Sequence, residues 1–348
     1  MRPVKAILSP ARLTAVAVSV VGVAVFHAFG LPLPFLLGPM FGCLVAALAG
    51  APLRGLGPLA TAMRIVLGVA VGSAITPELM HRMPQLVYSV ALVPPFILVI
   101  GAIGYPWFRK VCGFDHATSY FGAMPGGLQD MLVFGEEAGG NVRGLSLIHA
   151  TRVLVIVTAA PFLLQAMWGT PLLGSPGAAA VEMPPAELAI MAVTGTLGWY
   201  AARRVGLFGA PIIGPLAATA VVSLAGFIEH RPPRELLLAA QFILGLGAGA
   251  TYVGVTLREL RHDVASGIGY CVLLAGIAVV FAEIVIAIGA APPMEAFLAF
   301  APGGQSEMAI LAIVAGADLA YVVTHHLVRL VVVILGAPVV ARLVRAGR

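Results

Sequence analysis

Charged side chains are scarce in this sequence. Asp, Glu, Lys and Arg make up 10% of the 348 residues, while hydrophobic residues make up 60%. Soluble domains carry about 25% charged residues, so the composition excludes an ordinary soluble protein. The 41 glycines and 26 prolines interrupt apolar runs, where glycine lets helices approach one another and proline bends them. The composition therefore predicts an all-α integral membrane protein.

Cysteine pairs and the common catalytic motifs are also lacking. Cys43, Cys112 and Cys271 have no paired spacing, which argues against a disulfide or a thiolate metal site. The chain has no His-x-x-x-His helix, Cys-x-x-Cys pair, Walker loop or Gly-x-Ser-x-Gly elbow, the usual signatures of metal, nucleotide and acyl-transfer chemistry. His325 and His326 are adjacent, so they point apart on a helix. We expect no metal, no cofactor and no enzymatic activity.

An internal repeat is the strongest signal in the chain. AMPGGLQDM at 123–131 returns as FAPGGQSEM at 300–308, which is 177 positions later. The same offset aligns polar residues that are rare in this chain, and composition alone does not place such residues at matched positions. The aligned pairs include Asn141 with Asp318, His149 with His326, Arg152 with Arg329, Gly68 with Gly245, and Gly72 with Gly249. One hydrophobic unit was therefore duplicated.

Each copy has five apolar stretches long enough to cross a bilayer, which takes roughly 17–25 residues. In the first copy, residues 1–168, they lie at 11–30, 33–50, 58–78, 86–108 and 144–168. In the second copy, residues 186–348, they lie at 186–203, 207–227, 235–256, 266–290 and 318–341. A further stretch in each copy, at 116–135 and at 294–313, is interrupted by Pro-Gly-Gly. Residues 169–185 form a connector.

The basic residues predict the orientation of these spans. Arg2, Lys5 and Arg12 begin the chain and Arg342, Arg345 and Arg348 end it, which predicts cytoplasmic termini in a bacterial inner membrane. The connector at 169–185 has no Lys or Arg and belongs outside. An odd number of crossings per half then makes the Pro-Gly-Gly segment re-entrant and the two repeats inverted. Arg82, Arg231 and Arg234 fall in loops assigned outside. An arrangement of twelve spans in two parallel repeats therefore remains an alternative.

The Pro-Gly-Gly segments are the first candidate for a site. Proline removes a backbone donor, and irregular backbone in hydrocarbon must be satisfied by polar groups. Broken helices at the midplane commonly form substrate or ion sites in transporters. A carboxylate in the first turn of each exiting half-helix suits cation or proton coupling or, equally, simple helix capping. The candidate residues are Pro125, Gly126, Gly127, Gln129 and Asp130 in the first copy, and Pro302, Gly303, Gly304, Gln305, Ser306 and Glu307 in the second.

The last span of each copy carries the second set of candidates. His149 and His326 could relay protons, and Arg152 and Arg329 could bind an anion or neutralise nearby carboxylates. Asp318 and Arg329 are eleven positions apart and share a helix face, and Asn141 is aligned with Asp318. Polar residues recurring on paired helices favour a polar path over simple packing.

These features together resemble the AbrB-type duplicated membrane protein family. The resemblance rests on LLGP at 36–39, IIGP at 212–215 and the paired PGG segments, and it covers nearly the whole chain. The family carries the labels ammonia monooxygenase and AbrB-like regulator of gene expression. The architecture is also similar to that of the superfamily of cation/proton antiporters and anion transporters, which implies a secondary transporter with its site at the breaks.

Three functions follow from this reading. The leading one is cation- or proton-coupled transport of a small, anionic metabolite, with the bilayer and that substrate as partners. A membrane-embedded metabolite sensor that acts on gene expression indirectly is the alternative, and a monooxygenase has the least support because metal-ligand motifs are lacking. The arginines lie mostly between apolar segments, so no nucleic-acid partner is expected. A homo-oligomer is an open alternative to a monomer.

Overall fold

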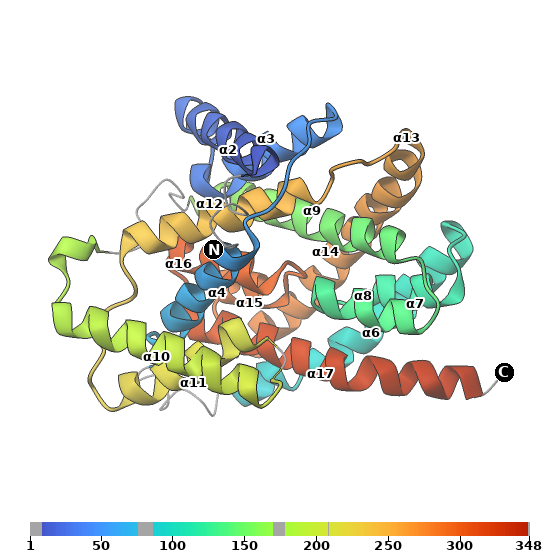
Figure 1. Ribbon diagram of the computed structural model, residues 1–348. Coiled ribbons are helices and arrows are strands. Elements are labelled where there is room, and N and C mark those ends of the chain that lie inside the picture. The colour runs from blue at the N-terminus through green and yellow to red at the C-terminus, as the bar shows by residue number, and fades with distance from the viewer. Residues whose placement is uncertain (1–8, 76–85, 170–177, 208, 347–348) are drawn as a thin grey trace. The chain divides into compact units, whose positions relative to one another are not determined.

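The computed structural model describes residues 9–75, 86–169, 178–207 and 209–346, without the side chains of Gln129 and 338–346. Every regular element in these ranges is helical, as the composition predicts (Figure 1). The chain divides into two compact units, each combining segments from both halves. The described residues of Met1–Met83, Pro161–Gly254 and Ala309–Ala320 form unit 1, and those of Pro84–Ala160, Val255–Met308 and Tyr321–Arg348 form unit 2.

Unit 1 is built from two similar groups of three helices. In both groups the second helix packs on the first, and Pro39 and Pro215 sit inside the two middle helices. The first group is α2 (Pro10–Ala28), α3 (Pro34–Leu48) and α4 (Gly57–Gly72), and the second is α10 (Pro185–Arg204), α11 (Ala210–Leu224) and α12 (Arg234–Ala250).

Glycines bring the helices of unit 1 into backbone contact. A Cβ added at Gly68 of α4 would collide with the carbonyl oxygen of Ile212 in α11. A Cβ added at Gly245 of α12 would collide with that of Leu36 in α3. The third helix of each group therefore packs on the middle helix of the other group, and the aligned glycines permit this close approach.

Unit 2 holds the broken elements and parts of the longest helices. The break in the first half separates α7 (His116–Ala123) from α8 (Leu128–Glu137), and the break in the second half separates α15 (Pro293–Phe300) from α16 (Gln305–Ala315). The sequence predicted interrupted stretches at these two places. The remaining elements are a helical segment at 86–90, α6 (Val93–Pro106), η1 (Trp107–Val111), α9 (Val142–Trp168), α13 (Leu257–Glu259), η3 (Leu260–Val264), α14 (Ala265–Ala287) and α17 (Leu319–Ala346).

Five described helices are long and apolar enough to cross a membrane: Pro10–Ala28, Leu86–Val111, Val142–Trp168, Leu257–Ala287 and Leu319–Ala337. At other expected spans, the helix in the structure is shorter than the apolar stretch in the sequence. The predicted span at 33–50 ends as α3 at Leu48 because Gly50 takes a left-handed turn, with φ 87°. A 15-residue helix rises about 22 Å, less than a hydrocarbon core of about 30 Å.

Some residues used to predict the orientation are not described. Residues 1–8, 76–85 and 347–348 fall outside the described ranges, as do the side chains of 338–346. The predictions for Arg2, Lys5, Arg82, Arg342, Arg345 and Arg348, and for residues 170–177 of the connector, therefore lie outside the described part of the chain.

Candidate functional site

Both breaks have an extended backbone between two short helices. Met124 ends α7 with φ −70° and ψ 131°, and Gly127 precedes α8 with φ −66° and ψ 142°. Ala301 follows α15 with φ −57° and ψ 123°. Because Pro125 and Pro302 supply no N–H and extended residues make no helical hydrogen bonds, carbonyl groups in each break need other partners.

Two buried arginines supply those partners. Arg152 of α9 donates from Nη1 to the Met124 carbonyl oxygen over 3.1 Å and from Nη2 to that of Gly126 over 2.9 Å. Arg329 of α17 donates in the same way to Ala301 over 3.2 Å and to Gly303 over 2.9 Å. The two side chains are 3% and 6% exposed. The second half therefore repeats the arrangement atom for atom, 177 positions later, and each Nε has no hydrogen-bond partner among the described residues.

Two buried histidines repeat in the same way. The Nε2 atom of His149 lies 3.1 Å from the Phe121 carbonyl oxygen, and that of His326 lies 3.0 Å from the Leu298 carbonyl oxygen. A carbonyl only accepts, so Nε2 carries the proton in both rings. Each Nδ1 is buried without a hydrogen-bond partner among the described residues. The histidines therefore hold the half-helices that precede the breaks and leave a lone pair free.

The paired glycines make room for the carboxylates. A Cβ added at Gly127 would collide with Oδ2 of Asp130, and one added at Gly304 would collide with Oε2 of Glu307. Each carboxylate therefore folds back from the first turn of its exiting helix toward the break, at the positive end of the helix dipole. A Cβ added at Gly126 would likewise collide with the side chain of Met131, and one added at Gly303 would collide with that of Met308.

Each break also meets the long helix of the other half. The Cβ position of Gly127 is 3.6 Å from Cδ1 of Leu330 in α17, and that of Gly304 is 3.6 Å from Cγ1 of Val153 in α9. These two contacts are again related by the offset of 177. The charges of Arg152 and Arg329 interact electrostatically. The structure therefore brings both breaks and both arginines into one site in unit 2.

Other predicted residues lie elsewhere. Asn141 is at the start of α9, where its Oδ1 accepts from the Gly144 N–H over 3.0 Å as a helix cap. Asp318 belongs to unit 1, and its charge acts on Arg231. Burial lowers the pKa of Arg231 and the negative charge of Asp318 opposes that shift. Ser306 is buried, and Nε2 of Gln305 is buried without a partner among the described residues. The Gln129 side chain is outside the described part.

The sequence reading missed two side chains at the site. Tyr270 of α14 is fully buried and donates from its hydroxyl to the Ala123 carbonyl oxygen over 2.6 Å. Ser89, also fully buried, contacts His325 of α17 over 3.1 Å. A lone tyrosine or serine in an apolar span carries no periodic signal, and the residue aligned with Tyr270 is Val93. Alignment of the halves shows Ser89 opposite Ser266, which is the one available clue.

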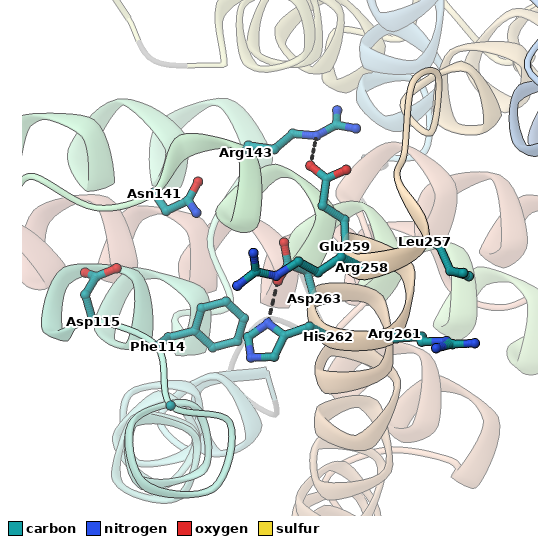
Figure 2. A pocket seen from close by; sticks show the side chains of 11 residues that line it. Phe114, Asp115, Asn141, Arg143, Leu257, Arg258, Glu259, Arg261, His262 and Asp263 are labelled. Carbon is teal, nitrogen blue, oxygen red and sulfur yellow. Dashed lines mark hydrogen bonds and ion pairs between the residues drawn. The ribbon is translucent and has the colours of Figure 1, made fainter.

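A cavity of about 930 Å³, lined by several charged side chains, lies at the ends of several unit 2 elements (Figure 2). It is lined by both flanks of the first broken segment, with Asp115 before α7 and Asn141 after α8. The Asn141 backbone N–H donates to Oγ1 of Thr118 over 2.8 Å, which joins these flanks. The second half contributes Leu257, Arg258, Glu259, Arg261, His262 and Asp263.

The carboxylates that line this cavity are bonded to neighbouring residues of the protein. Asp115 accepts from the Thr118 N–H, Glu259 from Arg143 over 2.9 Å, and Asp263 pairs with His262 over 2.7 Å. In Figure 2, Arg258 extends across the cavity. The cavity is therefore an arginine-rich end of unit 2 in which acidic groups fix the local structure. Within the described ranges, no group of three or more His, Cys, Asp and Glu side chains is placed to hold a metal ion.

Comparison with known proteins identifies two relatives and a family. The chain is 25% identical over 340 residues to "Putative regulator AbrB" of Escherichia coli (strain K12), covering 92% of both chains. It is 25% identical over 301 residues to "Uncharacterized protein YhjN" of Bacillus subtilis (strain 168), covering 80% of this chain and 77% of that protein. The family described as "Transition state regulatory protein AbrB" matches residues 35–345. Since that match spans most of the sequence, the chain belongs to this family.

Proposed function

We propose that this protein is a secondary transporter of a small anion, coupled to a cation or to protons. The observation that carries the proposal is the duplicated break, in which Arg152 and Arg329 hold the carbonyl groups of two interrupted helices. Interrupted helices facing one another across a repeat are the usual construction of transporter sites. The helix ends at 128 and 305 present N–H groups and positive dipole ends, which favour an anion.

The charges of the site support coupling. The two breaks together hold two buried arginines and two first-turn carboxylates, Asp130 and Glu307, so their formal charges sum to zero. Adding an anion to a site of low dielectric is unfavourable unless a positive charge enters with it. A cation at the carboxylates, or a proton, supplies that charge. Cation or proton coupling is therefore part of the proposal.

The cavity of Figure 2 supports re-entrant breaks and inverted repeats as further parts of the proposal. Asp115 and Asn141 flank the first broken segment and line one cavity, as expected if that segment enters and leaves on one side. Residues 257–263 of the second half line the same cavity. Residues 257–263 follow the third apolar stretch of the second half, at 235–256. Asp115 follows the fourth apolar stretch of the first half, at 86–108. Opposite orientations of the halves bring these two points to one side.

The proposed location is the bacterial inner membrane, with the arginine-rich cavity and both chain ends in the cytoplasm. Arg143, Arg258 and Arg261 line this cavity, and Arg109 and Lys110 end the span at 86–111. Basic residues are enriched on the cytoplasmic side of membrane proteins. A cysteine introduced at Arg261 should be labelled by an impermeant maleimide only after the inner membrane is opened.

The test of transport begins with ligand binding. Detergent-purified protein is screened by thermal shift against inorganic phosphate and a panel of mono- and dicarboxylates, because a bound ligand raises stability by mass action. Liposomes containing the protein are then tested for accumulation of each stabilising anion under an imposed pH or Na⁺ gradient. The Asp130→Asn/Glu307→Gln double variant should lose gradient-driven accumulation, while Glu259→Gln, at the cavity of Figure 2, should keep it. Accumulation by the double variant equal to that of the wild type would contradict the proposal.

A sensor is the second candidate, supported by the name of the Escherichia coli relative, "Putative regulator AbrB". A sensor would bind an anion at the same breaks without moving it. The two candidates separate in the liposome experiment: a thermal shift with no accumulation under either gradient favours the sensor, and accumulation favours the transporter.

A further inference from the structure

His325 differs from the other two buried histidines of unit 2 in its hydrogen bonds. It is 1% exposed, its Nδ1 atom lies 2.9 Å from the Tyr321 carbonyl oxygen, and its Nε2 atom lies 3.1 Å from Oγ of Ser89. A carbonyl accepts, so Nδ1 carries a proton. Both ring nitrogens of His325 therefore have partners, whereas His149 and His326 use one nitrogen each.

The Ser89 hydroxyl can satisfy either protonation state of His325. When the ring is neutral, the hydroxyl donates to Nε2. When the ring is protonated, Nε2–H donates to the hydroxyl oxygen, and the hydroxyl hydrogen turns to the Leu86 carbonyl oxygen, which lies 3.1 Å away. A hydroxyl is both donor and acceptor. One hydrogen bond reverses between the two states, and the ring loses neither of its partners.

His149 and His326 are unsuited to this change. Protonation would create a buried Nδ1–H with no acceptor among the described residues, which is unfavourable. It would also add a positive charge beside Arg152 or Arg329, whose charges already act on these rings. Hydrogen bonding and charge both keep these two histidines neutral.

His325 is also the buried histidine of this group that the repeat does not duplicate. The residue aligned with it is Ile148, while Ser89 is aligned with Ser266. Both halves thus keep the serine, but only the second has the ring. Within the described residues, the pair of His325 and Ser89 therefore has no counterpart across the repeat, although the break has one.

The charged neighbour of His325 on its own helix is Arg329, one turn further along α17. On its own helix, Tyr321, His326 and Arg329 are the nearest titratable or charged groups. The segment at 86–90 faces it with Ser89, and α15 faces it with the ring of Phe300, 5.7 Å away. No carboxylate in the described ranges is hydrogen-bonded to it. Protonation therefore adds one positive charge to the second half of the site.

We propose that His325 takes up and releases the coupled proton, with Ser89 reversing its hydrogen bond. This inference rests on the proposed transport function and names a proton as the coupling ion. The Nε2 lone pair forms a bond to a proton delivered by hydronium, which leaves as water, and the same N–H bond breaks when the proton passes back to a water molecule and forms hydronium. Because His325 is buried here, this exchange takes place in a conformation that admits water to the Ser89 side of the ring.

The test is a ¹⁵N NMR titration of the histidine rings in full-length protein in nanodiscs, which needs no substrate. His325→Gln, His326→Gln and His149→Gln variants assign the signals. We expect His325 to change from a neutral Nδ1–H ring to a doubly protonated ring between mildly alkaline and mildly acidic pH. His149 and His326 should keep neutral Nε2–H rings throughout. A His325 ring that stays neutral, or titration of either other ring instead, would overturn the proposal.

Serine variants separate the hydrogen-bond switch from general packing. Ser89→Ala removes the acceptor of Nε2–H, so the His325 titration should move to lower pH by about one to two units. Ser89→Thr keeps the hydroxyl and should restore the titration, while the aligned control Ser266→Ala should leave it unchanged. An unmoved titration in Ser89→Ala would also overturn the proposal. Titration without anion accumulation in liposomes would instead reject transport itself, so the two failures are distinguishable.

Discussion

Arg152 and Arg329 make the same pair of hydrogen bonds, each to carbonyl groups 28 and 26 residues earlier in the chain. A planar guanidinium presents several donors in a fixed fork and holds two carbonyl groups with two separate nitrogens, whereas lysine has a single nitrogen on a flexible stem. The arginines thus hold the backbone of the breaks in place and also carry positive charge at the site. Their equivalence can be tested in both halves separately.

Arg152→Lys and Arg329→Lys should each destabilise the protein by about 1–3 kcal/mol, because one buried carbonyl oxygen loses its donor while the charge stays. Thermal unfolding in detergent measures the change. The control is Arg143→Lys, whose side chain is 40% exposed and whose surface ion pair contributes about 1 kcal/mol at most. Equal effects at the control and the two break arginines would contradict this assignment.

Gly127→Ala should be destabilising through a clash with Asp130, and the effect should shrink when that carboxylate is also removed. The free-energy change in the Gly127→Ala/Asp130→Ala double variant should therefore be smaller than the sum of the two single changes by about 1 kcal/mol or more. Gly304→Ala with Glu307→Ala is the aligned test in the second half. Gly276→Ala is the control, because a Cβ there meets nothing within 4 Å. Additive single effects would indicate that the carboxylates do not fold over the breaks.

Gly245→Ala should destabilise unit 1 by about 1–3 kcal/mol, since the added methyl group overpacks the contact with the backbone of Leu36. Gly247, in the same helix, has nothing within 4 Å of an added Cβ. Gly247→Ala should therefore stabilise the helix by about 0.5–1 kcal/mol. Thermal unfolding of the two variants side by side measures both effects, and a loss of stability at both positions would argue against the close backbone contact.

The Arg143–Glu259 ion pair should contribute only about 0.2–1 kcal/mol, because both partners are partly exposed, at 40% and 23%. A double-mutant cycle with Arg143→Gln and Glu259→Gln gives the coupling energy, which should fall further as salt concentration rises. A coupling of several kcal/mol that is insensitive to salt would mean that the cavity of Figure 2 is closed to solvent.

The local sequence was sufficient to locate the breaks. Proline followed by two glycines cannot continue a helix, and the structure ends α7 and α15 just before these residues. Helix ends elsewhere were harder to predict. The stretch at 33–50 remains apolar beyond α3, and apolarity does not mark where the backbone turns. Left-handed glycines such as Gly50 decide that.

The partners of the polar residues depended on tertiary structure. The sequence paired Asn141 with His149 and Arg152 as parts of one path, but in the structure Asn141 caps a helix at the cavity end. The arginine forks hold backbone carbonyl groups, which carry no sequence signal. Ser89 reaches His325 across 236 positions of the chain, and no local pattern predicts such a contact.

The sequence by itself determined that this chain is helical, apolar and internally repeated, and where its helices break, because composition and the chemistry of proline and glycine act locally. The tertiary structure decided which polar atoms meet. Each compact unit takes segments from both halves, so the neighbours of a buried histidine or arginine come from distant parts of the chain. A buried polar group must find a partner in space, and the partners and charges around His149 and His325 come from the tertiary structure.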